Sequence, residues 1–191
     1  GGKTAIYTAA ILACLEAGRR SLQLVPEIAL AIPLVDRLRA DLHVDIGLVH
    51  SGLSDGERAD EWRRIRAGAV DVVVGTRLGV LAPVEDLGLV IVDEEHDQAY
   101  KSDRTPRLQA RDTAIRLGSH AGAAVVIGSA TPAVETEGRA RDGVYRRFRL
   151  TDRLSGRPPR IEVVDLRAEL AAGHRGMLSR PLHAALAALD I

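Results

Sequence analysis

Five short apolar runs, each followed by small or charged residues, restrict the fold of this chain more than any other feature. The runs are residues 21–25, 44–49, 70–74, 89–92 and 123–127, and each has the length of a buried strand. Helical patterns separate them, the clearest being an apolar stripe at Leu30, Leu34, Leu38 and Leu42. This alternation predicts an α/β fold with a mostly parallel, doubly wound sheet and helices on both faces.

Polar signatures follow each of these predicted strands directly. In an open parallel sheet the carboxyl ends of the strands lie at one edge, which is where ligands bind. The sequence therefore predicts a site at that edge, built from the segments Pro26-Glu27, His50-Ser51-Gly52, Thr76-Arg77, Asp93-Glu94-Glu95-His96 and Ser129-Ala130-Thr131.

The acidic segment that begins at Asp93 needs a positive charge beside it. Neighbouring carboxylates at a strand end are costly unless a cation compensates them, and Mg²⁺ carrying nucleotide phosphates is the usual one. The alternative is a turn that happens to be acidic, without a ligand.

The start of the chain supplies the matching phosphate site. Gly1-Gly2-Lys3-Thr4 runs directly into an apolar helical segment, residues 5–15. This is the end of a P-loop, in which backbone N–H groups and Lys3 hold phosphates and the Thr4 hydroxyl ligates Mg²⁺. The strand and glycine that complete such a loop would precede residue 1, so we expect the first strand of the sheet to be missing.

Composition limits the remaining possibilities. The chain has 191 residues, with 26 basic and 26 acidic side chains, so any DNA site must be a local patch. The single cysteine, Cys14, excludes a disulfide framework and fits a reducing, cytoplasmic setting. No secretory signal and no apolar run of membrane-spanning length is present, so we expect no membrane partner.

The amino-acid composition changes after residue 139. Residues 139–160 hold eight arginines against two aspartates, which is typical of a solvated surface but also of a contact with a nucleic-acid backbone. We expect one main domain in residues 1–150. Residues 151–191 should form a linker and the start of a following region, with a strand at 161–164 and a helix at 182–189.

These motifs together resemble the superfamily 2 helicases, and most closely their replication restart branch, the primosomal protein N′ family. The most specific segments are His50-Ser-Gly-Leu-Ser-Asp-Gly-Glu-Arg58 and Asp93-Glu-Glu-His-Asp-Gln-Ala-Tyr-Lys101. The resemblance implies a RecA-like P-loop NTPase lobe in a 3′→5′ DNA helicase and DNA-dependent ATPase. It also implies ATP and Mg²⁺ as cofactors, single-stranded or forked DNA as substrate, and primosome and replication-restart proteins as partners. The family's zinc-binding region has no counterpart in this sequence.

The resemblance also implies a role for each residue of the site. Gly1, Gly2, Lys3 and Thr4 would bind phosphates, Asp93 and Thr4 would hold Mg²⁺, and Glu94 would activate the attacking water. His96 and the segment Ser129-Ala130-Thr131 would couple the nucleotide to DNA. The path of the single strand would be lined by Pro26, Glu27, His50, Ser51, Gly52, Thr76 and Arg77.

Alternatives remain open at this point. A non-hydrolysing DNA-binding primosome scaffold would keep the fold without the motor, and a RecG-like branch-migration helicase is another branch of the superfamily. After Lys101 the family loop is rich in aromatic residues, whereas this chain has only Arg104 and Arg107 as DNA contacts there. The alternative for His50 is a strand-end histidine bonded to backbone, and the alternative for Tyr100 and Lys101 is a solvated helix end. Trp62 is expected in the core.

Overall fold

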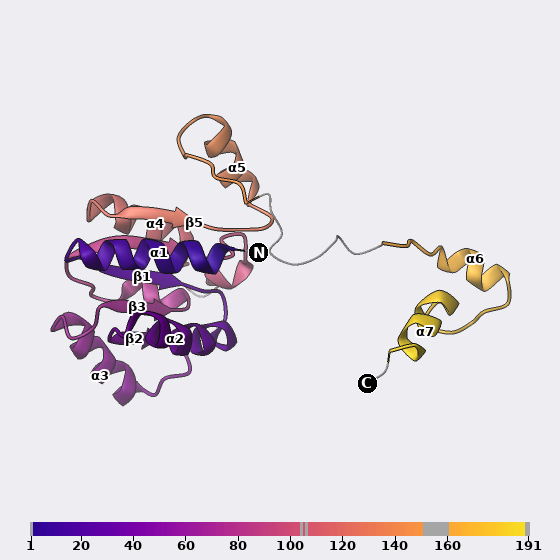
Figure 1. The fold of residues 1–191 in the computed structure, drawn as a ribbon, viewed down its shortest axis with the longest axis horizontal. Coiled ribbons are helices and arrows are strands. Elements are labelled where there is room, and N and C mark those ends of the chain that lie inside the picture. Colours follow the sequence, from indigo (N-terminus) through magenta and orange to yellow (C-terminus); the bar gives the residue numbers. More distant parts are fainter. Residues whose placement is uncertain (1, 104, 106, 151–160, 190–191) are drawn as a thin grey trace. The chain divides into compact units, whose positions relative to one another are not determined.

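A computed structural model describes residues 2–103, 105, 107–150 and 161–189 of the chain. The chain divides into two compact units, Gly1–Leu154 and Ser155–Ile191. The first unit contains the sheet, and the second contains two short helices (Figure 1).

A five-stranded parallel sheet forms the centre of the first unit. Its strand order is β2-β3-β1-β4-β5, and every neighbouring pair is parallel. The strands are β1 Arg20–Leu24, β2 Ile46–Val49, β3 Val72–Gly75, β4 Leu87–Val92 and β5 Ala124–Ile127. The predicted parallel sheet is therefore confirmed. The five strands pair without interruption, with β2 and β5 at the two edges.

Helices cover both faces of this sheet, as the sequence predicted. Helices α1 (Lys3–Glu16) and α2 (Ile28–Leu42) pack on one face, and α4 (Ala110–His120) packs on the other, beside the short 3₁₀ helix η1 (Arg77–Leu81) (Figure 1). Two apolar clusters result, one on each face, because the side chains of buried parallel strands point alternately to both sides.

Helix α3 (Asp55–Arg66) begins at a capping box formed by Ser54 and Glu57. The backbone N–H of Glu57 donates to Ser54 Oγ at 3.3 Å, and the Glu57 carboxylate accepts from the Ser54 N–H at 2.9 Å. Two N–H groups that a helix start leaves without partners are satisfied in this way. Helix α3 follows β2 directly, so the capping box also fixes where the chain turns back along the sheet.

Two sequence-based expectations are wrong. Residues 161–164 form no strand, and Val163 is 92% exposed, because this short apolar run has no neighbouring strand to pair with. Trp62 is exposed rather than in the core, since the highly charged helix α3 buries only Ile65. Tyr100, by contrast, is fully buried at the end of the 3₁₀ helix η2 (Gln98–Tyr100).

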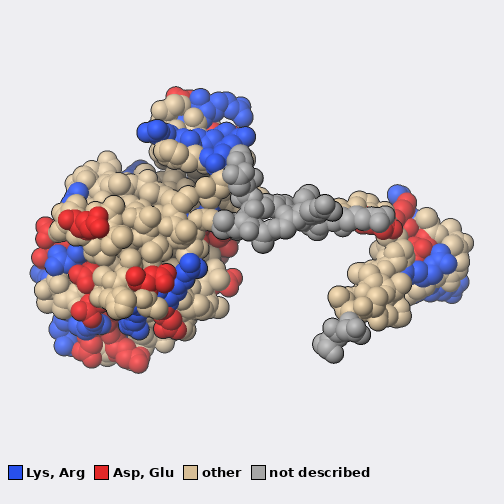
Figure 2. Space-filling view, viewed as in Figure 1, with Lys and Arg blue, Asp and Glu red and all other residues tan. Residues whose placement is uncertain are grey.

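Basic side chains gather over helix α5 (Val134–Arg141) and the residues that follow it (Figure 2). Arg146 stacks on the ring of Phe148 at 4.9 Å, and Arg147 forms an ion pair with Glu137. These contacts lie within the segment, and its last arginines, at 153, 157 and 160, lie outside the described residues.

The second unit contains helices α6 (Leu166–Ala171) and α7 (Arg180–Ala187). Arg180 Nη2 lies 3.0 Å from Glu169 Oε1, which joins the two helices. Ser179 caps α7, and the predicted last helix is present. Throughout the described part of the chain, every helix is too short or too polar to cross a membrane.

Candidate nucleotide site

The first turn of α1 faces the carboxyl end of β4. Lys3 Nζ lies 3.1 Å from Asp93 Oδ1 and also donates a hydrogen bond to Glu94 Oε1. The Lys3 and Asp93 side chains are each 24% exposed and that of Glu94 is 32% exposed. A cation and two carboxylates thus meet at the rim of the sheet, accessible to solvent on one side.

The charge of Lys3 is stabilised by these neighbours. Burial lowers the pKa of Lys3, but hydrogen bonds to Glu94 and Asp93 outweigh burial, so the pKa is raised above its ordinary value. Lys3 is therefore a permanent cation at neutral pH. It compensates the two carboxylates, as partly buried charges require.

Two tyrosines that were not singled out from the sequence as part of the site hold Asp93 from either side. Tyr7 donates its hydroxyl to Asp93 Oδ1 at 2.9 Å, and Tyr100 donates to the Asp93 carbonyl oxygen at 2.7 Å. Burial raises the pKa of both tyrosines, and the negative charge of Asp93 raises it further. Both stay protonated donors. The position of Tyr7, four residues after Lys3 and so on the same helix face, was the available signal.

Glu94 adopts a backbone conformation that is uncommon outside glycine. Its φ is +45°, in the left-handed region, which costs on the order of 1 kcal/mol or more for such a residue. The Glu94 N–H donates to Asp93 Oδ1 at 3.0 Å, which helps to hold this turn. Strain of this kind is found where a functional side chain must be aimed.

His96 connects the acidic segment to the end of β5. Ser129 Oγ is hydrogen-bonded to His96 Nδ1 at 2.7 Å, and the Thr131 N–H donates to Ser129 Oγ at 2.9 Å. His96 Nδ1 also lies 3.7 Å from Glu94 Oε2. Polar contacts therefore run from Glu94 through His96 to Ser129. Ala130, which follows Ser129 in the loop after β5, is exposed.

The other predicted phosphate-binding residues lie at the start of α1. Gly2 is the N-cap of this helix, and Thr4 lies in its first turn, where its carbonyl accepts from Thr8 Oγ1 at 3.0 Å. Gly1 lies outside the described residues.

The residues predicted to line a DNA strand follow β1, β2 and β3, and two of them, His50 and Arg77, are hydrogen-bonded to backbone groups. Gly52 donates its N–H to His50 Nδ1 at 3.1 Å, which is the backbone-bonded alternative for that histidine. Arg77 Nη1 donates to the carbonyls of Ala99 and Lys101, at 3.3 and 2.9 Å. It thereby ties η1 to the segment after the acidic motif.

Three further members of that set differ in exposure. Glu27 is exposed at the start of α2, immediately after the buried Pro26, and Ser51 is exposed after β2. Thr76 is only 7% exposed, so little of it is available to a ligand.

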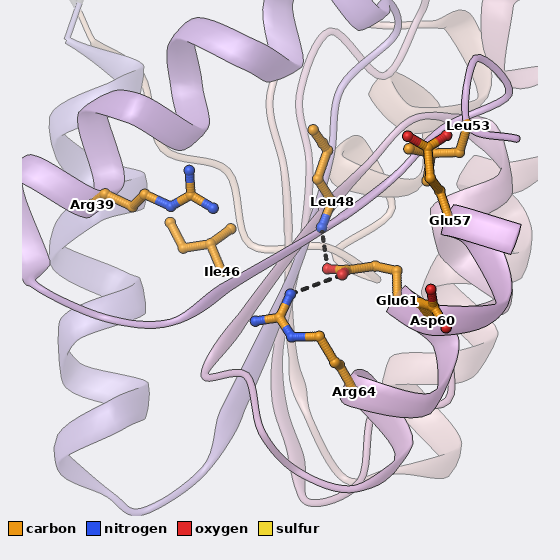
Figure 3. A pocket seen from close by; sticks show the side chains of 8 residues that line it. All are labelled: Arg39, Ile46, Leu48, Leu53, Glu57, Asp60, Glu61 and Arg64. Atoms are coloured by element: carbon orange, nitrogen blue, oxygen red, sulfur yellow. Dashed lines mark hydrogen bonds and ion pairs between the residues drawn. The ribbon is translucent and has the colours of Figure 1, made fainter.

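A separate cavity of about 320 Å³ lies at the β2 edge of the sheet, between α2 and α3. Glu61 crosses it, accepting from the Leu48 N–H and from Arg64, both at 2.8 Å (Figure 3). The carboxylate thus covers an N–H of the edge strand, a common protection against pairing with another chain. None of the residues lining this cavity belongs to the Lys3–Asp93 cluster.

The residues at the nucleotide site fit ATP and Mg²⁺. Lys3 and the N-terminus of α1 are positive groups of the kind that bind phosphate. The Asp93 carboxylate and the Thr4 hydroxyl supply the oxygen ligands that Mg²⁺ prefers. Asp93 is held by Tyr7 and Lys3 through one oxygen, Oδ1.

Comparisons with known proteins give the relatives of this chain. A sequence model of the DEAD/DEAH box helicase family matches residues 1–138. The replication restart protein PriA of Bacillus subtilis is 43% identical over 93% of this chain, and PriA of Treponema pallidum is 43% identical over 88%. The chain spans only 22% and 26% of those proteins. The resemblance to replication restart helicases predicted from the sequence is thus confirmed.

Solved structures show the same fold. RecG bound to a three-way DNA junction is similar with a TM-score of 0.53 and 26% identity, over 75% of this chain and 18% of RecG. A hypothetical ATP-dependent RNA helicase from Sulfolobus tokodaii has a TM-score of 0.53 at 20% identity, over 76% of this chain and 43% of that protein. The predicted RecA-like fold is confirmed.

Proposed function

This chain belongs to the DEAD/DEAH box helicase family, and from that membership we propose that it is the ATP-binding lobe of a DNA-dependent ATPase. The parent activity is 3′→5′ DNA unwinding in replication restart and primosome assembly, with residues 1–150 as the lobe and 151–191 leading into the following region. The observation that carries this proposal is the meeting of Lys3 with Asp93 and Glu94 at the carboxyl end of the sheet.

Each group of the site has a distinct task in this proposal. Lys3 and the N–H groups at the start of α1 bind the phosphates, and Asp93 with Thr4 holds Mg²⁺. Bound Mg²⁺ would neutralise charge on the phosphate oxygens. Glu94 orients the attacking water and accepts its proton on a carboxylate oxygen.

The ion pair between Lys3 and Glu94 gives this site a resting arrangement. While Lys3 donates to Glu94 Oε1, that oxygen is engaged and is a poor base. When Lys3 turns to a phosphate, the Glu94 oxygen becomes available to water. Phosphate binding and base activation would then occur together, which limits hydrolysis by a misplaced water.

DNA contacts form the second part of the proposal. Pro26, Glu27, His50, Ser51, Gly52, Thr76 and Arg77 follow neighbouring strands at the edge where the nucleotide site lies. Backbone amides, hydroxyls and a guanidinium at such positions suit the phosphates of a single strand without reading its sequence. Forked DNA, primosome proteins and a cytoplasmic setting belong to this proposal.

The test is DNA-stimulated ATP hydrolysis by the full-length natural protein that carries this sequence. Glu94→Gln should lower the turnover number by roughly 10²- to 10⁴-fold, the contribution of a positioned general base, while ATP binding persists. Glu135→Gln, the same change at an exposed position of α5, is the matched control. Unchanged turnover in Glu94→Gln would overturn the proposed role of Glu94. Absence of ATP hydrolysis by the unmodified protein would favour the alternative, a DNA-binding primosome scaffold that does not hydrolyse ATP.

We also propose that residues 1–191 alone do not unwind DNA. Motors of this kind bind ATP between two lobes, and an arginine from the facing side raises the rate by roughly 10³- to 10⁵-fold in comparable NTPases. The sheet of the first unit supplies one such lobe. Unwinding of a forked duplex by the isolated chain at the rate of the full-length natural protein would contradict this.

A further inference from the structure

Glu95 is the one carboxylate of the acidic segment that points into the protein. Its side chain is 1% exposed, whereas those of Asp93 and Glu94 reach the nucleotide site. Three donors satisfy it. The Ala133 N–H donates to Oε1 at 2.7 Å, and Thr136 Oγ1 and Arg111 Nη1 donate to Oε2 at 3.0 and 3.1 Å.

The backbone of Glu95 makes a further contact with the same region. Its N–H donates to the carbonyl oxygen of Gly128 at 3.1 Å. Gly128 and Ala133 are the two ends of the loop between β5 and α5, so Glu95 holds that loop at both ends. The enclosed residues include Ser129, whose hydroxyl bonds to His96, the residue next to Glu95.

The charge of Glu95 makes this contact strong and specific. A buried carboxylate is tolerated only when it is paired and hydrogen-bonded. Arg111, which is also bonded to Asp112 at 3.0 Å, supplies the compensating charge from α4. Three separate elements, namely β4, α4 and the start of α5, are therefore joined at one side chain.

We infer that Glu95 is a positioning residue that holds the Ser129 loop against His96 and so couples the nucleotide site to the DNA side of the lobe. Glu95 touches neither phosphate-binding nor water-activating groups. It acts through the loop, whose position sets the 2.7 Å contact between Ser129 and His96. The inference rests on the proposed function, because coupling has meaning only if DNA binding controls ATP hydrolysis.

Thr136 allows a test without disturbing the buried charge pair. Thr136→Val in the full-length natural protein removes one donor to Glu95 and keeps the shape, and Thr136→Ser restores the hydroxyl. Thr113→Val is the matched control, since the Thr113 hydroxyl donates to the Gln109 carbonyl at the start of α4. The measurements are the turnover number and KM for ATP, with and without single-stranded DNA.

Thr136→Val should lower the DNA-stimulated turnover about 2- to 30-fold, the range that coupling residues show, with KM and the DNA-independent rate unchanged. Thr136→Ser and Thr113→Val should behave like the unmodified protein. Glu95→Gln, which removes the buried partner of Arg111 and leaves its ion pair with Asp112, should reduce stimulation further.

The outcomes separate the two proposals. If the unmodified protein hydrolyses no ATP, the proposed function fails and the inference fails with it. If hydrolysis is stimulated by DNA equally in the unmodified protein and in Thr136→Val, only the inference is overturned. Equal loss in Thr136→Ser or in Thr113→Val would overturn it as well, because the hydroxyl contact with Glu95 would then not be the cause.

Discussion

The hydroxyl of Tyr7 donates to Asp93 Oδ1 at 2.9 Å, which links the phosphate-binding helix α1 directly to the carboxylate proposed to hold Mg²⁺. The same oxygen accepts from the Glu94 N–H and lies beside Lys3. Three donors on one oxygen fix the orientation of the carboxylate before any ligand arrives. Such pre-orientation favours a hard cation that needs a defined geometry.

Removing the Tyr7 hydroxyl should make the orientation of the Asp93 carboxylate less fixed without creating a cavity in the core. Tyr7→Phe keeps the ring, which is 4% exposed, and deletes one hydrogen bond to a partly exposed carboxylate. We expect the free energy of unfolding to fall by about 1 kcal/mol, and more Mg²⁺ to be needed for half-maximal ATP hydrolysis. Urea unfolding and a Mg²⁺ titration check the two effects. An unchanged Mg²⁺ requirement would show that the Tyr7 hydroxyl does not orient Asp93.

Gly128 leaves room for the same hydroxyl. A Cβ at Gly128 would collide with the Tyr7 oxygen, so Gly128→Ala should cost about 1–3 kcal/mol of unfolding free energy, as overpacking does. In the double variant with Tyr7→Phe the cost should be smaller than the sum of the two single costs, because the obstructing atom is gone. Gly138→Ala, where nothing lies within 4 Å of the added carbon, is the control. Additive costs would contradict this contact.

The fold could be predicted from the sequence because its signals are local. Each strand is a short apolar run with a polar end, and parallel strands must bring those ends to one edge. The placement of Lys3 beside Asp93 follows from that rule together with the P-loop signature at the start of α1. The signal for the start of α3 is equally local, since Ser54 and Glu57 form the capping box within four residues.

Side-chain direction after a strand could not be predicted in the same way. Glu94 has a positive φ, and no sequence pattern predicts that conformation for a glutamate. The resulting turn leaves the Glu94 side chain at the site, while the Glu95 side chain is buried. The burial of Tyr100 depends likewise on tertiary contact, because its hydroxyl reaches back to the Asp93 carbonyl. Local patterns therefore located the acidic segment but did not assign its third residue.

The start of α3 should respond to acid in a defined direction. The pKa of Glu57 is lowered below its ordinary value of 4.5, because the Ser54 hydroxyl and N–H both donate to its carboxylate. A carboxyl group with a lowered pKa stabilises the fold above its ordinary pKa, and the effect is lost as the pH falls through the folded value. Thermal unfolding should therefore favour the unmodified chain over Glu57→Gln at pH 7, with the difference vanishing well below pH 4.5. A difference that persists in acid would show that the Glu57 charge is not its source.

Lys3 should matter more for ATP binding than for folding. Lys3→Ala removes a cation that is about one quarter exposed, so we expect at most about 1 kcal/mol of lost stability. Loss of a charged phosphate contact should weaken ATP binding roughly 10- to 100-fold. Lys101→Ala, the same change at an exposed lysine, should leave ATP affinity unchanged. Fluorescent-nucleotide titration and thermal unfolding measure both quantities.

The pH dependence of that ATP affinity gives Lys3 a second, independent check. The pKa of Lys3 is raised above 10.5, because hydrogen bonds to Glu94 and Asp93 outweigh the effect of burial. A raised pKa means that the positive charge, and the contacts that depend on it, persist until the pH rises past that value. The ratio of ATP affinities between the unmodified protein and Lys3→Ala should therefore stay constant from about pH 7.5 to pH 9. A ratio that falls across this range would mean that Lys3 loses its proton there, and that the carboxylates do not hold its charge.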